Sequence, residues 1–128
     1  MRKLRILIAD DSIIILRKLS QIFEDLGHTV IDTARTGSDV VAKYDREKID
    51  LVSMDITMPD MDGIAATHKI LEKDPSARVL VITSHGQEQM IVEAISAGAM
   101  GYILKPFNQE KINAMIEKIM TNGEGQES

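Results

Sequence analysis

Acidic, hydroxyl and amino side chains in this sequence each come directly after a short apolar run. The acidic residues are Asp10, Asp11 and Asp55, and the other two are Thr83 and Lys105. Two unit charges about 5 Å apart repel by roughly 3 kcal/mol at an effective dielectric near 20, so three carboxylates gathered in one crevice would take up a proton or bind a cation. Oxygen ligands with no His or Cys beside them in the sequence suit Mg²⁺, which keeps several of its waters.

The charge balance of such a crevice points to phosphoryl transfer. Three carboxylates and Lys105 leave two net negative charges, which one divalent cation would cancel. The cation and Lys105 would then offset the charge of an incoming phosphoryl group, and Thr83 would donate a hydrogen bond to it. Asp10 and Asp11 are adjacent, which suits them to hold a metal from one side, whereas Asp55 stands alone. We therefore assign Asp55 as the nucleophile that forms an aspartyl phosphate.

Each of these features alone has a simpler interpretation. An Asp after a strand is most often a turn residue or a helix cap, an Asp pair before a helix can simply favour the helix dipole, and Lys-Pro indicates a turn. Turns do not, however, require such residues at the ends of four separate runs. Their joint occurrence favours a site.

Five apolar, β-branched runs would position these side chains. We expect strands at 5–9, 29–33, 50–54, 78–82 and 101–104. Four are continuously apolar, as in strands covered on both faces, and the second is mixed, which suits a sheet edge. Segments with helical periodicity lie between them, at about 12–26, 36–46, 64–72, 87–98 and after Asn108, with Ser84 as a possible cap of the fourth.

This alternation predicts an α/β fold with a doubly wound five-stranded parallel sheet and helices on both faces. In such sheets the ligand crevice lies at the carboxyl ends of the strands, where all the candidate residues fall. We expect one folded domain over 1–120 and a flexible polar tail over 121–128.

Composition narrows the classes of function. The formal net charge of −5 and the low aromatic content of 3% argue against a nucleic-acid surface. Cys is absent, which excludes disulfides and thiolate metal sites and fits a reducing compartment. Because no apolar run reaches the roughly 18 residues of a membrane span, we expect a cytoplasmic protein that binds neither nucleic acid nor membrane.

Four stretches make the sequence recognisable: ILIADDS (6–12), MDITMPDMDGI (54–64), VITSHG (81–86) and GYILKPF (101–107). With these motifs the chain resembles the receiver domains of bacterial two-component response regulators, most closely the single-domain chemotaxis (CheY-like) regulators, over about residues 3–120. The resemblance implies the flavodoxin-like strand order 2-1-3-4-5, known for chemotaxis regulators, in which strands one and three are neighbours. The receiver domain would then cover 1–120.

The resemblance also implies roles for single residues in a phosphorelay. Asp55 matches the acceptor of a phosphoryl group from a histidine kinase. Asp11 and Asp55 match direct Mg²⁺ ligands, Asp10 acts largely through water, and the main-chain carbonyl of Thr57 completes the protein ligands. Lys105 matches the residue that pairs with a phosphoryl oxygen, and its bond to Pro106 is expected to be cis.

Signalling is expected to run through a hydroxyl and an aromatic side chain. Thr83 matches the switch that moves toward the phosphoryl group, and Tyr102 the aromatic that turns into the vacated space. From the residues alone, Tyr102 would be a strand aromatic half-buried at a sheet edge. The face formed by the fourth helix, fifth strand and fifth helix is the family's usual output surface, so a separate output protein is expected there. Motor binding in chemotaxis, a relay and control of an enzyme all remain open.

Two positions depart from the best-known chemotaxis pattern. Thr57 and His85 replace more usual polar or acidic residues. The resemblance implies that these two side chains flank the path of attacking water, which bears on the lifetime of the phosphorylated state. His28 and His68 are expected to be ordinary surface residues, because three scattered histidines do not make a metal cluster.

Two other classes share parts of this pattern. An aspartyl-phosphate phosphohydrolase uses Asp and Mg²⁺ but normally has Asp-x-Asp after its first strand, whereas this chain has the adjacent pair Asp10-Asp11. A flavodoxin-like FMN carrier needs a hydroxyl-rich phosphate loop and aromatic cover, and this chain has no Trp and only two Phe and two Tyr. We therefore expect a signalling module, not a metabolic enzyme, with at most self-catalysed phosphorylation and dephosphorylation.

Overall fold

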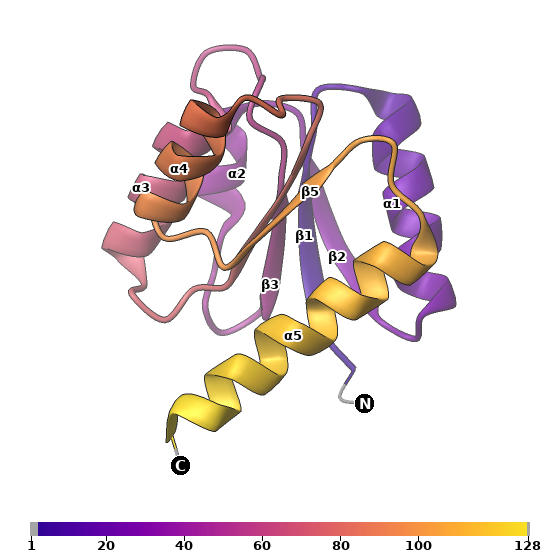
Figure 1. The fold of residues 1–128 in the computed structure, drawn as a ribbon. Helices are drawn as coiled ribbons and strands as arrows, with labels where there is room; N and C mark the ends of the chain where they lie inside the picture. Colours follow the sequence, from indigo (N-terminus) through magenta and orange to yellow (C-terminus); the bar gives the residue numbers. More distant parts are fainter. Residues whose placement is uncertain (1–2, 128) are drawn as a thin grey trace.

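A parallel five-stranded sheet lies at the centre of the computed structural model, which describes residues 3–127 (Figure 1). Its strands are β1 (Arg5–Ala9), β2 (Thr29–Ala34), β3 (Leu51–Met54), β4 (Val79–Thr83) and β5 (Gly101–Leu104). Their order, β2-β1-β3-β4-β5, confirms the predicted fold class and strand order. Because β1 and β3 are neighbours with Ala9 opposite Met54, the residues that follow both strands leave the sheet side by side.

Helices cover both faces of the sheet. They are α1 (Ile13–Asp25), α2 (Gly37–Lys43), α3 (Gly63–Lys73), α4 (Glu88–Ser96) and α5 (Gln109–Glu127). α1 and α5 lie on one face, and α2, α3 and α4 lie on the other (Figure 1). Within 3–127 none of them combines the length and the apolar character that crossing a membrane would take.

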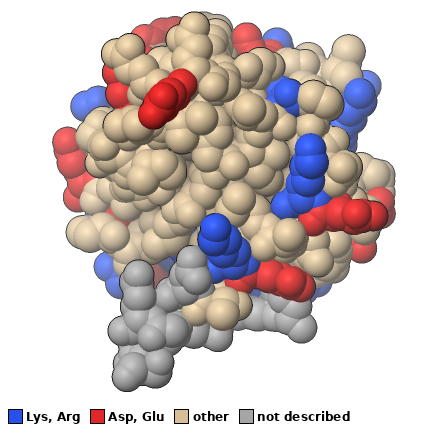
Figure 2. Space-filling view, in the orientation of Figure 1, with Lys and Arg blue, Asp and Glu red and all other residues tan. Residues whose placement is uncertain are grey.

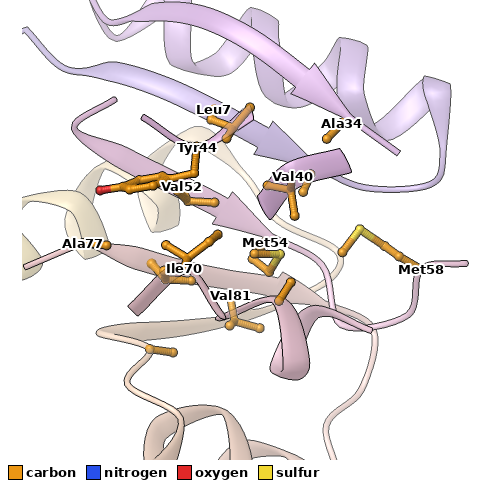
Figure 3. Packing of buried hydrophobic residues seen from close by; sticks show 14 of the residues in the cluster. Leu7, Ala34, Val40, Tyr44, Val52, Met54, Met58, Ile70, Ala77 and Val81 are labelled. Atoms are coloured by element: carbon orange, nitrogen blue, oxygen red, sulfur yellow. The ribbon is translucent and has the colours of Figure 1, made fainter. Parts of the chain in front are cut away.

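Side chains of the inner strands alternate between two buried clusters. In β1, Leu7 points toward α2–α4 and packs with Val52, Met54 and Val81 (Figure 3). Its neighbour Ile8 belongs to the cluster under α1 and α5. Burying an aliphatic side chain contributes roughly 1.5–3 kcal/mol, so these strands are apolar at nearly every position rather than at every second one.

Side-chain caps begin four of the helices. The side chains of Ser12, Thr36, Asp62 and Asn108 accept hydrogen bonds from backbone N–H groups in the first turns of α1, α2, α3 and α5. Such a cap contributes about 1 kcal/mol. The predicted cap at Ser84 is wrong, because α4 begins at Glu88 and its N-cap, Gln87, makes no side-chain hydrogen bond.

Two element ends differ from prediction by more than two residues. α2 stops at Lys43 and not near 46, because Tyr44 takes an extended backbone with ψ 128° while its ring stays buried and its hydroxyl donates to Asp74 at 2.6 Å. α5 continues as helix to Glu127, over residues predicted to be a flexible tail, and Ser128 lies outside the described residues. The division into a domain over 1–120 and a tail over 121–128 stays a prediction.

His28 is not the surface residue that we predicted. It is 5% exposed, and its Nδ1 atom accepts a hydrogen bond from the backbone N–H of Leu4 at 3.0 Å. The imidazole of His28, just before β2, thus accepts a hydrogen bond from the backbone of Leu4, just before β1. His68 is exposed, as predicted.

Candidate functional site

The three candidate carboxylates meet at the carboxyl ends of β1 and β3. One oxygen from each of Asp10, Asp11 and Asp55 lies within 4.8 Å of the other two. Asp10 and Asp55 are buried, at 1% and 5% exposure, whereas Asp11 is exposed. The strand pairing brings them together, since the N–H of Asp55 donates to the carbonyl of Ala9 at 3.0 Å.

Lys105 brings a positive charge into the same crevice from the end of β5. Its Nζ atom lies 2.8 Å from Oδ2 of Asp10 and 3.6 Å from Oδ2 of Asp55. The Lys105–Pro106 peptide bond is cis, as expected. The predicted grouping of Lys105 with the carboxylates is therefore present.

The surroundings of Asp55 disfavour its ionised form. Burial raises the pKa of its carboxyl group, and the negative charge of Asp10 raises it further. A hydrogen bond from the Thr83 hydroxyl, the charge of Lys105 and the N–H of Ile56, 2.9 Å from Oδ1, oppose the increase without cancelling it. A cation among the carboxylates would relieve this repulsion, and an all-oxygen donor set fits Mg²⁺.

The loop after β3 passes close behind the site, and this depends on Gly63. A Cβ atom at Gly63 would lie 2.0 Å from the carbonyl oxygen of Asp55, which is too close for any side chain. Only glycine fits at this position. The N–H of Gly63 also donates to the carbonyl of Ile56 at 2.7 Å. Gly63 could not be assigned to the site from the sequence, because the close approach arises only on folding and the local signal is just a glycine after the cap Asp62.

Thr83 and Tyr102 are linked through His85 and not directly. Thr83 is fully buried, and its hydroxyl oxygen accepts from the N–H of His85 at 3.4 Å. The hydroxyl of Tyr102, which is half-buried on the edge strand β5, donates to the carbonyl of His85. Nε2 of His85 forms a hydrogen bond with the hydroxyl of Thr57. His85 thus contacts both residues of the predicted switch, Thr83 and Tyr102, a connection that the sequence did not reveal.

Thr57 lies on the exposed side of the site. Its hydroxyl group contacts His85, across two loops that are 28 residues apart in the sequence. The role expected for its main-chain carbonyl, as a metal ligand, stays a prediction.

Comparisons with known proteins agree with this geometry. The family described as "Response regulator receiver domain" matches residues 6–117. Chemotaxis protein CheY of Listeria monocytogenes is 41% identical over 115 residues, which cover 90% of this chain and 97% of the relative. Chemotaxis protein CheY of Bacillus subtilis is 40% identical over 116 residues, covering 91% and 97%.

Solved structures show the same fold. A chain of the CheX-CheY-BeF3-Mg+2 complex from Borrelia burgdorferi superposes with a TM-score of 0.88 at 39% identity, covering 91% of this chain and 89% of that one. A CheY-like response regulator receiver domain protein from Methanospirillum hungatei has a TM-score of 0.88 at 31% identity, covering 98% and 99%. Because the family match and these likenesses extend over most of the chain, the protein belongs to the response regulator receiver domains of two-component signalling.

Proposed function

We propose that Asp55 accepts a phosphoryl group from a phosphohistidine of a histidine kinase, at a site where Mg²⁺ is held. The observation that carries this proposal is the meeting of three carboxylates within 4.8 Å, with the Lys105 ammonium 2.8 Å from Asp10 and 3.6 Å from Asp55. A purely structural arrangement has no reason to gather three negative charges at one edge of a sheet.

The transfer is a single displacement at phosphorus. A carboxylate oxygen of Asp55 forms the new P–O bond, the P–N bond to the donor histidine breaks, and its electron pair stays on the imidazole nitrogen. Lys105 offsets the charge of the phosphoryl oxygens, and the hydroxyl of Thr83 donates a hydrogen bond to one of them. Asp10 keeps the Lys105 ammonium in place before the donor arrives.

Asp10, Asp11, Asp55 and the main-chain carbonyl of Thr57 are the groups that would hold Mg²⁺. When bound, the ion supplies positive charge that offsets the carboxylates and the incoming phosphoryl group. The raised pKa of Asp55 supports this assignment, because it reports an electrostatic cost that a cation removes.

Phosphorylation is proposed to change partner binding through Thr83 and Tyr102. A phosphoryl group gives the buried Thr83 hydroxyl a new acceptor, which draws the hydroxyl away from the N–H of His85. Because the carbonyl of His85 accepts from Tyr102, a shift of this residue reaches the ring on β5.

The face formed by α4, β5 and α5 is the proposed surface for a separate output protein. Figure 2 shows it largely free of charged side chains over α4 and β5. Exposed apolar residues lie on it: Val92, Ile95, Met100 and Leu104. A groove of about 480 Å³ between β5 and α5 includes Tyr102 in its lining, so the switch residue borders the surface that a partner would cover. The relatives named chemotaxis proteins support a role in chemotaxis.

The test of the phosphoacceptor is labelling of Asp55→Asn with radioactive acetyl phosphate or phosphorylated kinase. We expect no stable labelling, because the amide is not a nucleophile at neutral pH. Asp60→Asn is the matched control: it removes the same charge from an exposed position in the following loop, and its positive φ of 67° suits Asn. Full labelling of Asp55→Asn would place the phosphoryl group on another residue.

A further inference from the structure

Arg35 connects the end of β2 with the metal-binding loop after β1. It follows β2 directly, and its guanidinium donates from Nε at 3.2 Å and from Nη2 at 3.0 Å to one acceptor, the main-chain carbonyl of Asp11. Two N–H groups from a rigid planar side chain on one oxygen form a charge-assisted contact with a defined direction. The contact joins residues 24 apart in the sequence.

The start of α1 explains why this carbonyl accepts a side chain. The N–H of Leu16 donates to the carbonyl of Ser12, and the N–H of Ile15 donates to the Ser12 hydroxyl. The carbonyl of Asp11 therefore lies just before the helical hydrogen-bond ladder. Arg35 supplies the donors that the helix does not.

The two adjacent aspartates are held very differently. Asp10 is buried, with its carboxylate bonded to Lys105 and to the N–H of Ser12 at 3.0 Å. Asp11 is exposed, and in the described part of the chain the only side-chain hydrogen bonds to it come from Arg35. Among these hydrogen bonds, the contact that bears on the direction of the Asp11 carboxylate is therefore the one that holds its main chain.

We infer that Arg35 is a positioning residue for the metal site, which fixes the backbone of Asp11 so that its carboxylate stays directed toward Asp10 and Asp55. This inference rests on the proposed Mg²⁺ site. Arg35 does not touch the metal or the phosphoryl group in this account, and it acts only through Asp11.

A positioning role and a charge role predict opposite effects on Mg²⁺ affinity. The guanidinium is positive and bonds the main chain of Asp11, which is an anionic ligand in the proposed site, so removing its charge alone would make the crevice more negative and tighten cation binding. Removing a positioning contact would instead weaken binding, because Asp11 must then be ordered when the ion arrives. Loss of an outer-shell partner weakens metal binding by roughly tenfold or more.

The experiment measures the Mg²⁺ dissociation constant by calorimetry for wild type, Arg35→Ala, Arg35→Lys and Arg17→Ala. We expect it to rise roughly tenfold in Arg35→Ala, to rise less in Arg35→Lys, whose ammonium can donate one bond to the carbonyl, and to stay unchanged or fall in Arg17→Ala. Arg17 is the matched control because it is exposed and borders the same groove between α1 and β2 as Arg35. Labelling by acetyl phosphate should be slow in Arg35→Ala at limiting Mg²⁺ and return to the wild-type rate at saturating Mg²⁺.

Unfolding by urea in the presence of a chelator separates positioning from stability. A merely structural Arg35 would lower the unfolding midpoint and leave the dissociation constant of the folded protein unchanged, which would overturn the inference, as would tighter binding in Arg35→Ala. If Arg35→Ala does not fold, Arg35→Lys decides, and a wild-type dissociation constant there overturns the inference. The proposed function fails separately, if wild type and Asp11→Ala bind Mg²⁺ equally.

Discussion

The surroundings of Asp55 disfavour its negative charge in the metal-free protein. Burial and the neighbouring Asp10 raise its pKa, and the contacts from Lys105 and Thr83 do not fully compensate. The same surroundings that make ionised Asp55 unfavourable in the metal-free protein make the crevice attractive to a cation. The surroundings that suit the proposed role of Asp55 therefore lower the stability of the fold when no cation is bound.

Asp55→Asn should accordingly raise the free energy of unfolding in a chelator at neutral pH. Because the pKa of Asp55 is higher in the folded than in the unfolded state, its ionised form destabilises the fold above that pKa, and the cost disappears as the pH falls below the unfolded value. Lys105 keeps its partner Asp10 in the variant. Urea unfolding near neutrality and in mild acid measures the gain, which should shrink in acid. A variant less stable than wild type under both conditions would contradict this.

His28 should make stability depend on pH in the opposite direction. Burial lowers its pKa below the ordinary 6.5, and its Nδ1 atom must stay unprotonated to accept from Leu4. The unfolded state therefore takes up a proton more readily, so this stability is full above about pH 6.5 and is lost as the pH falls. His28→Asn, which keeps an acceptor without a titrating ring, should flatten urea-unfolding stability between neutral pH and mild acid. His68→Asn, at an exposed position, is the control, and equal slopes in wild type and His28→Asn would exclude the effect.

At the scale of elements, the loop between β4 and α4 connects the site with the proposed output face. Within that loop His85 contacts Thr83 by its N–H, Tyr102 by its carbonyl and Thr57 by its ring. These three partners come from β4, from β5 and from the loop after β3. In the proposed switch, a shift at the end of β4 would therefore reach the edge of the sheet through this one residue.

Thr83→Ala should be phosphorylated and yet lose the response of Tyr102. Asp55 and the metal ligands are untouched, so acetyl phosphate still labels the protein, but the differential contact between the two states is gone. Fluorine NMR of protein containing 3-fluorotyrosine reports the two rings, and Tyr44→Phe assigns them. We expect the Tyr102 signal to shift on phosphorylation in wild type and in Ser84→Ala, but not in Thr83→Ala. A wild-type shift in Thr83→Ala would disprove the coupling.

At the scale of the whole molecule, two buried clusters hold the strands that carry the site. One packs α2, α3 and α4 against the sheet and the other packs α1 and α5 (Figures 1 and 3). β1 and β3 have buried side chains on both faces, so the residues at their carboxyl ends have little freedom to separate. Carboxylates held close together by the core transmit their repulsion to the stability of the entire fold.

Mg²⁺ should therefore stabilise the whole chain. A ligand that binds only the folded state adds about 2.7 kcal/mol at 100 times its dissociation constant. In urea unfolding, the free energy of unfolding of wild type should rise by this amount with Mg²⁺ and return to its starting value on chelation. The rise should be strongly reduced in Asp11→Ala at the same Mg²⁺ concentration. Asp60→Asn should keep the full gain. Equal stabilisation of wild type and Asp11→Ala would remove Asp11 from the metal site.

Local patterns in the sequence determined the architecture and the core of the site. Apolar, β-branched runs predicted the five strands to within one residue at each end. Four of the runs are continuous, because burial on both faces leaves few polar positions in a strand. The acidic residues and Lys105 were found because each follows a strand, and parallel strands end at one edge. The strand order came from family resemblance, since no local pattern encodes which strands are neighbours.

Contacts between distant segments were decided only by the tertiary structure. Three such contacts join residues whose local sequence suggests a turn or a surface. They are the hydrogen bond accepted by His28, the close approach of Gly63 to Asp55, and the contact of His85 with Thr57. Arg35 is the clearest case, because it is an exposed arginine after an edge strand and its local sequence gives no sign of a partner. Packing then brings its guanidinium to the carbonyl of Asp11, a partner 24 residues away that no periodicity could indicate.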